Sequence, residues 1–552
     1  SLDQALQGKI AGAQILLNSG EPGATANIQL RGINSLGNAN PIILLDGVQI
    51  GTGNSASALA GLDISNIERV EVVKGAAAGM LYGAQGANGV IQIFTKRGSR
   101  NQRLSVTLSS KAIIDEVIRG KHSLIAELHH YDTDAEGFIL STGGGRIAPD
   151  PVTGTWSDPE VNLTPNLLNN KPYRERTFDH LDQVYRRAFS HNTSLNISGG
   201  SNKVDYSFNV NNLLQQNVRF GDLDRKNIGV NLGVELFEGF SFRNTTQFVI
   251  ETENLQSGNR FSVVNAYPWI DFNATYDNGF KVIKPKSENE YNPLSELEWR
   301  TRESRNNRLI QNINLNYKFP KFVEVDYKYG VQLWNTNYSD IIRSQKGFLQ
   351  PSDAFWGQSP GTGTVTLRND KSTYQNSLLS LIVRTDFKND FNSSLPIITT
   401  TQLTYDWRKD EYENFFGYAN GFAYPPYNLT NGSTKNSGSY SESFITFGYL
   451  VNQNIDYGTL AGVSFGFRSD YSSEFGFNPD GKIKPFLFPR GTAYFNAGEI
   501  IKSSFAPGIK LRAAYGEAGV QPDRFARQPV LSGRIFGDIP GLYVPDLGKN
   551  AF

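Results

Sequence analysis

Apolar and polar residues alternate with a period of two along most of the chain after residue 104. Residues 312–319 read NINLNYKF and residues 323–331 read VEVDYKYGV, so apolar side chains occupy every second position. A β-strand points successive side chains to opposite faces, and this alternation therefore predicts strands with one apolar and one polar face. Counting such runs predicts about thirteen strands between residues 104 and 517.

The connections between these runs alternate between short and long. Turns such as GGSNK at 199–203 and PKF at 320–322 join neighbouring runs into antiparallel hairpins. The long connections cover about residues 113–190, 255–305, 336–372, 406–442 and 516–552. Short turns at one end and long loops at the other are typical of a transmembrane β-barrel, whose strands must close because lipid offers the backbone no hydrogen-bond partner.

A soluble sandwich or propeller would also alternate. The membrane barrel is favoured by Phe and Tyr at strand ends, by long loops at one end only, and by Asn, Asp, Glu and Lys in mid-strand. No apolar run is long enough for a transmembrane helix. The odd strand count and the loop-like ending at 543–552 lead us to expect further strands, or another chain, to complete the wall. Because the first residue is Ser and no signal peptide precedes it, we expect a processed or partial product.

Residues 1–98 differ in composition from the rest of the chain. They are rich in Ala, Gly, Ile and Val and contain only two aromatic residues, Tyr82 and Phe94. We predict a compact α/β domain at 1–98 and a barrel region at 99–552, separated near the basic stretch KRGSRNQR. Within the first domain, strands are expected at 11–18, 27–32, 41–50, 67–75 and 89–98, and short helices at 1–10 and 76–86.

Charge and cysteine content exclude several functions. Lys plus Arg and Asp plus Glu each number 53, so the formal net charge is zero and no overall field attracts nucleic acid. The chain has no Cys, which excludes disulfide scaffolds, thiol catalysis and Cys-based metal sites. No Ser-His-Asp arrangement or carboxylate pair stands out, so we expect neither an enzyme nor a cofactor.

Four segments of the first domain carry a family signature. They are LDQALQGKIAG (2–12), NSGEPGATANIQLRG (18–32), NPIILLDGV (40–48) and the run from DISNIERVEVVKG to FTKRG (63–98). Together they resemble the plug of the SusC/RagA family of TonB-linked outer-membrane transporters. Residues 188–216 look like the first long hairpin of that family, and residues 509–522 like a later strand.

The resemblance implies a membrane β fold, with an N-terminal α/β plug inside a large antiparallel barrel of about 22 strands. It implies TonB-dependent import of a bulky nutrient, an oligosaccharide or oligopeptide, across the outer membrane. A SusD-like surface lipoprotein would be the partner and TonB the energy source. The chain departs from the family pattern at Gly75, Ala84-Gln85 and Gln49. These departures suggest an alternative, a non-transporting structural subunit of a larger envelope complex.

Two groups of plug residues are candidate sites under this resemblance. Arg31 resembles the family's buried plug arginine, which needs carboxylate partners, and we expect an ion network between plug and barrel. Its predicted members are Arg31, Glu68, Arg69 and Glu71; a static plug-core salt bridge is the alternative. The polar loops at 34–40 and 51–58 are expected to touch cargo through Asn34, Asn38, Asn40, Asn54 and Ser55.

Other motifs have simpler interpretations. Gly75, Gly79, Gly83, Gly86 and Gly89 lack the spacing of a phosphate loop and favour tight packing. His129 and His130 adjoin Asp132 and Asp134, which permits a metal site, although a solvated loop fits equally. Several aromatic residues expected in loops are candidates for stacking on sugar rings, or for girdle and loop packing: Trp156, Tyr267, Trp269, Trp334, Trp356, Tyr418, Tyr424 and Tyr427.

Overall fold

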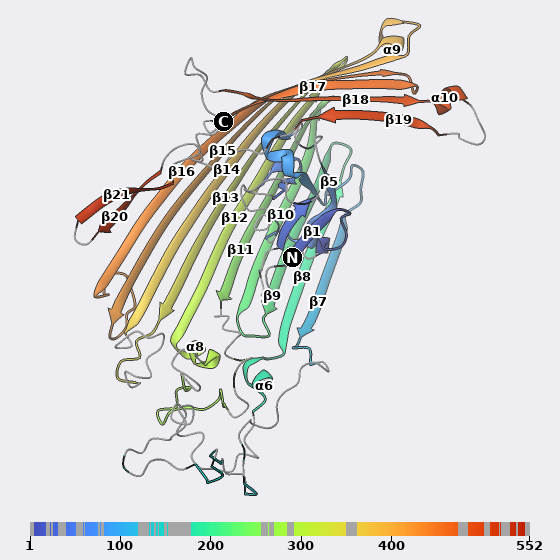
Figure 1. The fold of residues 1–552 in the computed structure, drawn as a ribbon. Coiled ribbons are helices and arrows are strands. Elements are labelled where there is room, and N and C mark those ends of the chain that lie inside the picture. The colour runs from blue at the N-terminus through green and yellow to red at the C-terminus, as the bar shows by residue number, and fades with distance from the viewer. Residues whose placement is uncertain are drawn as a thin grey trace.

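A single curved antiparallel sheet of 13 strands dominates the computed structural model, with the strands side by side in chain order (Figure 1). The strands are β7 (Ser105–Asp115), β8 (Ala188–Gly200), β9 (Val204–Gln216), β10 (Asp222–Phe237), β11 (Phe240–Leu255), β12 (Arg300–Lys318), β13 (Val323–Ile342), β14 (Gly363–Asp386), β15 (Ile397–Phe422), β16 (Thr434–Tyr457), β17 (Ala461–Ser472), β18 (Phe486–Asn496) and β19 (Lys510–Gly516). The predicted number and antiparallel order are confirmed. Among the described strands, β7 and β19 each pair on one side only.

The structure describes most of the sheet and about two thirds of the N-terminal region. The described residues are 5–17, 26–30, 40–50, 61–74, 82–119, 178–255, 270–283, 292–348, 362–472, 484–501, 508–517, 530–536 and 539–546, with isolated positions between them. Within these ranges, no helix is long and apolar enough to cross a bilayer.

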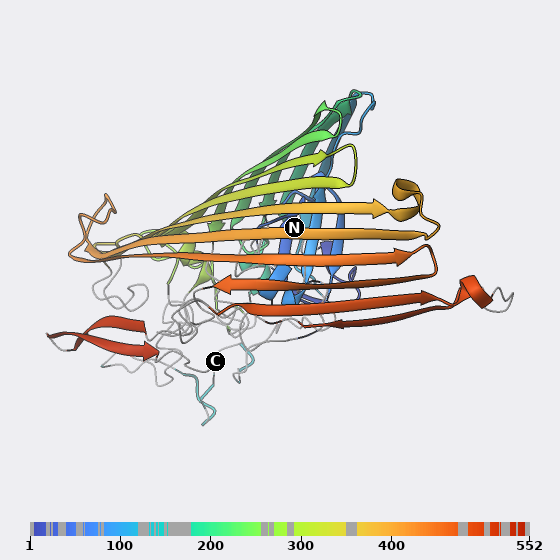
Figure 2. The ribbon, with the colours of Figure 1, turned by 90° about the horizontal axis from the view of Figure 1, so that it is seen from above.

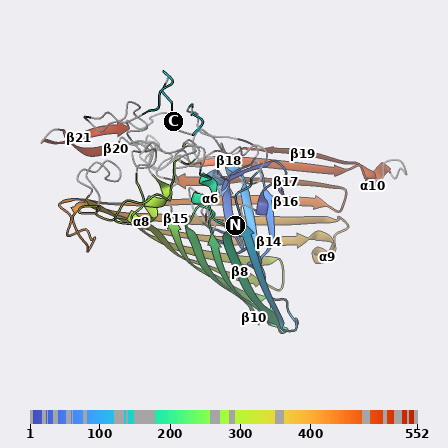
Figure 3. The same ribbon diagram turned by 90° about the horizontal axis from the view of Figure 1, so that it is seen from below.

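The N-terminal region folds into two small sheets on the concave side of the large sheet (Figures 2 and 3). One pairs β1 (Ala13–Leu17) with β2 (Ala26–Leu30). The other has the order β4 (Val48–Gln49), β3 (Ile42–Leu45), β6 (Val90–Thr95), β5 (Ile67–Val73), with β3 and β6 parallel. All five predicted strand runs are therefore strands, the third as a hairpin. Apolar residues from both sheets, including Ile28, Ile43, Leu45, Ile91 and Ile93, form one core.

Two short 3₁₀-helices complete this region. They are η1 (Ile64–Asn66) and η2 (Gly83–Asn88). Of the predicted helix at 76–86, residues 83–86 belong to η2, and residues 76–77 and 79–81 lie outside the described residues. At the start of the chain, residues 5–6 are helical and residues 7–9 form a turn.

The two faces of the large sheet have opposite character. On one face of β14 and β15, Leu379, Leu381 and Leu403 are exposed, whereas Ser380 and Thr404 on the opposite face are buried. The inner face carries the buried polar residues and meets the N-terminal region, so the exposed apolar residues line the outer face. The predicted alternation of apolar and polar positions therefore corresponds to these two faces.

Four strands are longer than the sequence pattern predicts. The expected loops at 336–372 and 406–442 are wrong over much of their length, because β13 to β16 have 20 to 26 residues each. A membrane-spanning strand needs about 9–11 residues. Beyond that length both faces are polar, as at Asn369, Asp370 and Lys371, so the apolar alternation fades although the strands continue.

The end of the large sheet opposite the short turns also carries packed elements. The short helices α6 (His180–Val184) and α8 (Pro293–Trp299) lie there (Figure 1). Val184, Val263, Ile270, Phe272 and Leu294 form a buried cluster between them. The remaining elements are α9 (Phe387–Phe391), α10 (Gly498–Ile501) and the separate hairpin of β20 (Val530–Phe536) and β21 (Ile539–Asp546).

Candidate functional site

The interface between the N-terminal region and the inner face of the sheet is the most elaborate polar site in the described part of the chain. Asparagine amides along β9, β10 and β12 contact the N-terminal region directly. Asn312 donates to the Leu45 carbonyl at 2.9 Å, Asn227 donates to the Gly61 carbonyl at 3.2 Å, and Asn231 donates to Thr95 Oγ1 at 3.3 Å. We call Asn227, Asn231 and Asn312 the amide seam. Its bonds are neutral and single, so each contributes about 1 kcal/mol.

The β3–β4 hairpin packs against the same part of the 13-stranded sheet, which we call the wall. Its turn is Asp46-Gly47, with φ of 51° and 87°, the left-handed geometry of a two-residue hairpin. Val48 then packs against Gly330 of β13, where any Cβ would collide with the Val48 side chain. A glycine at 330 is therefore needed for the hairpin to approach the wall this closely.

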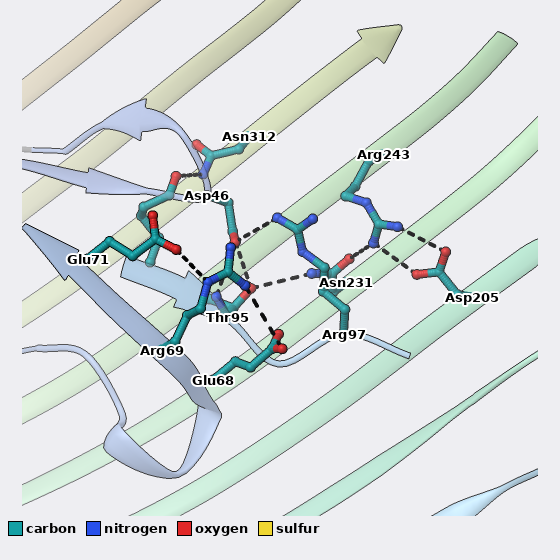
Figure 4. Close-up of polar contacts among 11 residues, drawn as sticks. Asp46, Glu68, Arg69, Glu71, Thr95, Arg97, Asp205, Asn231, Arg243 and Asn312 are labelled. Atoms are coloured by element: carbon teal, nitrogen blue, oxygen red, sulfur yellow. Dashed lines mark hydrogen bonds and ion pairs between the residues drawn. The ribbon is translucent and has the colours of Figure 1, made fainter. Parts of the chain in front are cut away.

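Asp46 links the hairpin to the end of β6. Its carboxylate accepts hydrogen bonds from Thr95 N at 3.1 Å, Thr95 Oγ1 at 2.6 Å and Arg97 at 3.0 Å (Figure 4). The side chain of Asp46 is only 4% exposed, so these donors replace the water it has lost. The turn, β6 and the seam contact at Asn231 thus form one connected network.

The wall supplies its own charged support for this network. Arg243 of β11 contacts both carboxylate oxygens of Asp205 at 2.9 Å and also donates to Asn231 Oδ1 at 2.7 Å (Figure 4). The Asn231 amide group is thereby oriented with its nitrogen toward Thr95. The bidentate geometry fixes the guanidinium, and through it the seam contact.

A second, charged contact lies on β15 and β17. Asp406 accepts hydrogen bonds from Arg408 at 2.5 Å and from Arg468 at 2.8 Å, and Arg468 also donates to Asp470 at 2.6 Å. We call these four residues the ion cluster. Arg408 in turn donates to the Tyr82 carbonyl at 3.2 Å. The cluster therefore joins the strands to one another and to the segment that begins η2.

Gly83 shows how close this second contact is. Its φ is +74°, and a Cβ there would collide with Asp470 and Arg468. Next to it, burial raises the pKa of the Tyr82 hydroxyl, which accepts a hydrogen bond from Gln92 at 2.6 Å. The backbone at 82–83 thus lies in close contact with charged residues of the wall, although residues 82 and 83 carry no charge themselves.

Comparison with known proteins agrees with this architecture. Residues 1–90 match the TonB-dependent Receptor Plug Domain family. The TonB-dependent receptor SusC of Bacteroides thetaiotaomicron is 27% identical over 346 residues, which cover 57% of this chain and 31% of that protein. The TonB-dependent receptor P3 of Formosa agariphila is 26% identical over 543 residues, covering 94% of this chain and 48% of that protein.

A solved structure extends the comparison to the whole fold. The RagAB peptide importer in its open-open state superimposes with a TM-score of 0.76 at 19% identity, covering 99% of this chain and 61% of that chain. In sequence and fold the chain is similar to TonB-dependent receptors of the SusC/RagA type. It spans about half the length of the curated relatives it matches.

The predicted ion network of the plug lies apart from the seam and the ion cluster. Arg69 pairs with Glu71 at 2.8 Å and with Glu68 at 4.0 Å, and all three side chains are about half exposed. The Arg69 guanidinium also lies 3.8 Å from the Phe94 ring centroid. The hydrogen bond to Glu71 raises the pKa of Arg69. These three residues form a local network on β5 (Figure 4), and Arg31 lies outside the described residues.

The predicted cargo-contacting residues lie mostly outside the described part of the plug. Asn34, Asn38, Asn54 and Ser55 are not described, and Asn40 immediately precedes the β3 region, half-buried. Trp334 and Tyr418, expected in loops, are instead strand residues of β13 and β15. Tyr424 and Tyr427 do lie in a loop, and Trp156, Tyr267, Trp269 and Trp356 are not described.

The histidine motif is described only in part. His129 and His130 fall outside the described residues, whereas Asp134 forms an ion pair with Arg146. No cluster of metal-ligating side chains occurs among the residues that the structure does describe. His180 lies elsewhere, in α6, where it donates through Nε2 to the Ile270 carbonyl at 2.7 Å.

Sequence reasoning missed the seam and the ion cluster. Asp406 and Arg408 are two residues apart on one strand, so their shared face was readable from the alternation. Their partner Arg468 is 60 residues further on, and no local pattern connects it to them. The seam asparagines looked like ordinary lumen-facing residues. Asn227 and Asn312 donate to main-chain carbonyls, which carry no sequence signal, and Asn231 donates to the hydroxyl of Thr95, which is 136 positions away in the chain.

Proposed function

We propose that the chain forms the plug and part of the barrel of an outer-membrane transporter for a bulky nutrient, an oligosaccharide or oligopeptide. In this proposal residues 1–98 are the plug domain and residues 99–552 belong to the barrel. The observation that supports it is that the plug packs against the inner face of the wall. The plug contacts are mostly single neutral hydrogen bonds, which a modest input of energy can exchange for water.

The partners follow from the same proposal. A SusD-like surface lipoprotein would cover the loop end, and TonB would supply the energy that shifts the plug. Asn34, Asn38, Asn40, Asn54 and Ser55 remain our candidates for cargo contact on the plug. Arg31, Glu68, Arg69 and Glu71 remain candidates for an ion network that rearranges during transport. No residue is assigned a catalytic role, because transport forms no covalent bond with cargo.

A disulfide between plug and wall tests whether the plug must move. Thr95 and Asn231 face each other across the seam, with Oγ1 and Nδ2 3.3 Å apart, and the chain has no native Cys. We expect the oxidised Thr95→Cys/Asn231→Cys receptor to lose uptake and growth on its nutrient in the host cell. Reductant should restore both, and each single-Cys variant should behave as the unmodified receptor.

The same experiment separates transport from a structural role. Normal uptake with the disulfide shown to be fully formed would contradict the proposal that the plug gates the barrel. A host whose growth on every oligosaccharide and oligopeptide tested is independent of the receptor would instead favour the non-transporting envelope subunit.

A further inference from the structure

The inner face of the wall continues beyond the plug contacts toward the loop end, and there it changes character. β15 carries Arg408 against the plug, and Tyr412 and Phe416 share its face at spacings of four residues, about 13 Å apart. β13 carries Gly330 against the plug, and Trp334 and Tyr338 follow on its face in the same way. Neither stretch contains a register shift, so these aromatic side chains lie on the luminal side.

Between these two aromatic strands lies a polar one. The luminal positions of β14 at this level are Arg368, Asp370 and Ser372. Neighbouring strands are about 4.8 Å apart, so the aromatic side chains of β13 and β15 flank β14 at about 10 Å from each other. Across the sheet the registered rows are Tyr338–Arg368–Phe416, Thr336–Asp370–Asn414–Tyr440 and Trp334–Ser372–Tyr412–Glu442. We call these residues the luminal rail.

Hydrogen bonds hold the rail in a fixed arrangement. Asp370 accepts from the Tyr412 hydroxyl at 2.7 Å, from Asn414 at 2.6 Å and from Arg368 at 2.8 Å. The Tyr440 hydroxyl donates to Glu442 at 2.5 Å, and the Tyr412 and Tyr440 ring centroids are 6.4 Å apart. These hydrogen bonds fix the positions of the Tyr412 and Tyr440 hydroxyls. Ring surface remains accessible, because Tyr440 is 50% exposed and Phe416 is 38% exposed.

Two donors on the same face have no partner among the described residues. They are the Trp334 indole nitrogen and the hydroxyl of Tyr374, which is only 3% exposed and lies two residues from Ser372 on β14. Buried donors without partners are costly and are rare in folded proteins. They lie at the plug end of the rail and are covered in this structure, so they are not part of the accessible surface of the rail.

We propose that the luminal rail is a binding site for a neutral oligosaccharide on its way to the plug. This inference rests on the transport function proposed above and assigns its cargo class. Flat aromatic rings accept the apolar faces of sugar rings, while carboxylate, amide and guanidinium groups between them meet hydroxyls. Arg368 and Asp370 already neutralise each other, so a charged cargo would gain little from them.

Peptide is the less favoured cargo for a structural reason. Extended peptides commonly bind by adding a strand to a free sheet edge. β13, β14, β15 and β16 are each paired on both sides, so their backbones offer no such edge here. Recognition at the rail must therefore come from side chains, and these are aromatic and hydrogen-bonding groups.

Neighbouring phenylalanines on β15 give a matched test. Phe416 faces the lumen and Phe415 faces outward, 38% and 49% exposed, so Phe416→Ala and Phe415→Ala make the same change on opposite faces. The purified receptor would be screened in detergent against an array of neutral linear oligosaccharides and a library of neutral, acidic and basic octapeptides. We expect at least one oligosaccharide to bind, about tenfold more weakly to Phe416→Ala and unchanged to Phe415→Ala.

Three results would overturn the assignment: no oligosaccharide on the array binds, only peptides bind, or both phenylalanine variants weaken binding equally. Tyr412→Phe adds a check that a merely misfolded variant cannot mimic, because it keeps the ring and removes only the bond to Asp370. It should weaken binding less than Phe416→Ala. If the seam disulfide stops uptake but no sugar binds, the rail assignment fails alone. If sugars bind the rail and the disulfide leaves uptake unchanged, the transport proposal fails alone.

Discussion

The two faces of the wall strands place neighbouring residues in different environments. On β15, Leu403 and Tyr405 are exposed on the outer face, whereas Thr404 and Asp406 between them are buried on the inner face. The outer positions suit hydrocarbon, and the inner ones suit a polar plug and other buried charges. In these strands the type of a residue therefore depends on the face on which it lies. The buried inner face is polar, and the exposed outer face is apolar.

The largest expected effect concerns a charge on the inner face. Asp406→Ala removes the carboxylate that pairs with both Arg408 and Arg468, in a cluster where every side chain is at most 11% exposed. Removing one partner of a buried ion pair costs about 3–5 kcal/mol. We expect the free energy of unfolding in lipid vesicles, measured by urea titration, to fall by about that amount.

An outer-face ion pair provides the control for that variant. Asp224 pairs with Lys226 at 2.9 Å on the outer face of β10, where both side chains are partly exposed. Asp224→Ala should lower the free energy of unfolding by less than about 1 kcal/mol. Equal losses for the two variants would show that the ion cluster is not buried as described.

An introduced charge should lower the free energy of unfolding more on the outer face than on the inner face. Leu403→Arg places a cation in the outer apolar belt, which costs about 2–4 kcal/mol near the middle of a bilayer. Gln402→Arg makes the same substitution on the adjacent inner-facing position, where polar neighbours such as Thr404 surround it. We expect urea titration in vesicles to show the larger loss for Leu403→Arg, and the reverse order would invert the assignment of the faces.

The smallest expected effect is at the loop end, beyond both faces. Burial lowers the pKa of His180 below its usual value of about 6.5. Below pH 6.5 the unfolded segment therefore binds more protons than the folded one, and stability falls as pH drops through the lowered pKa. Above pH 6.5 this contribution is constant.

Hydrogen exchange at α6 and residues 270–272, corrected for intrinsic rates, measures that dependence. Protection should decrease between pH 7 and pH 5 in the unmodified chain. His180→Gln should remove most of the change. An unchanged pH dependence in His180→Gln would assign the effect to other groups.

Sequence alone predicted the faces well and the contacts poorly. The alternation around Ile313 and Val325 fixed the strands, because only a two-sided sheet produces that period. It failed near Asp370 and Asn414, where both faces are polar and the strands read as loops. Arg69 and Glu71 share a face as two-residue spacing requires, but whether that face meets the wall depends on how β5 is oriented in the plug. The amide seam joins residues more than 130 positions apart, which no periodicity reveals.

Lipid accessibility along β15 tests the central claim most directly. Single cysteines at positions 402, 403, 404 and 405 of the Cys-free chain can carry a fluorescent label in vesicles containing brominated lipid. The account predicts strong quenching at 403 and 405 and weak quenching at 402 and 404. Uniform quenching, or none at all four positions, would contradict a wall with one face in lipid and the other around the plug.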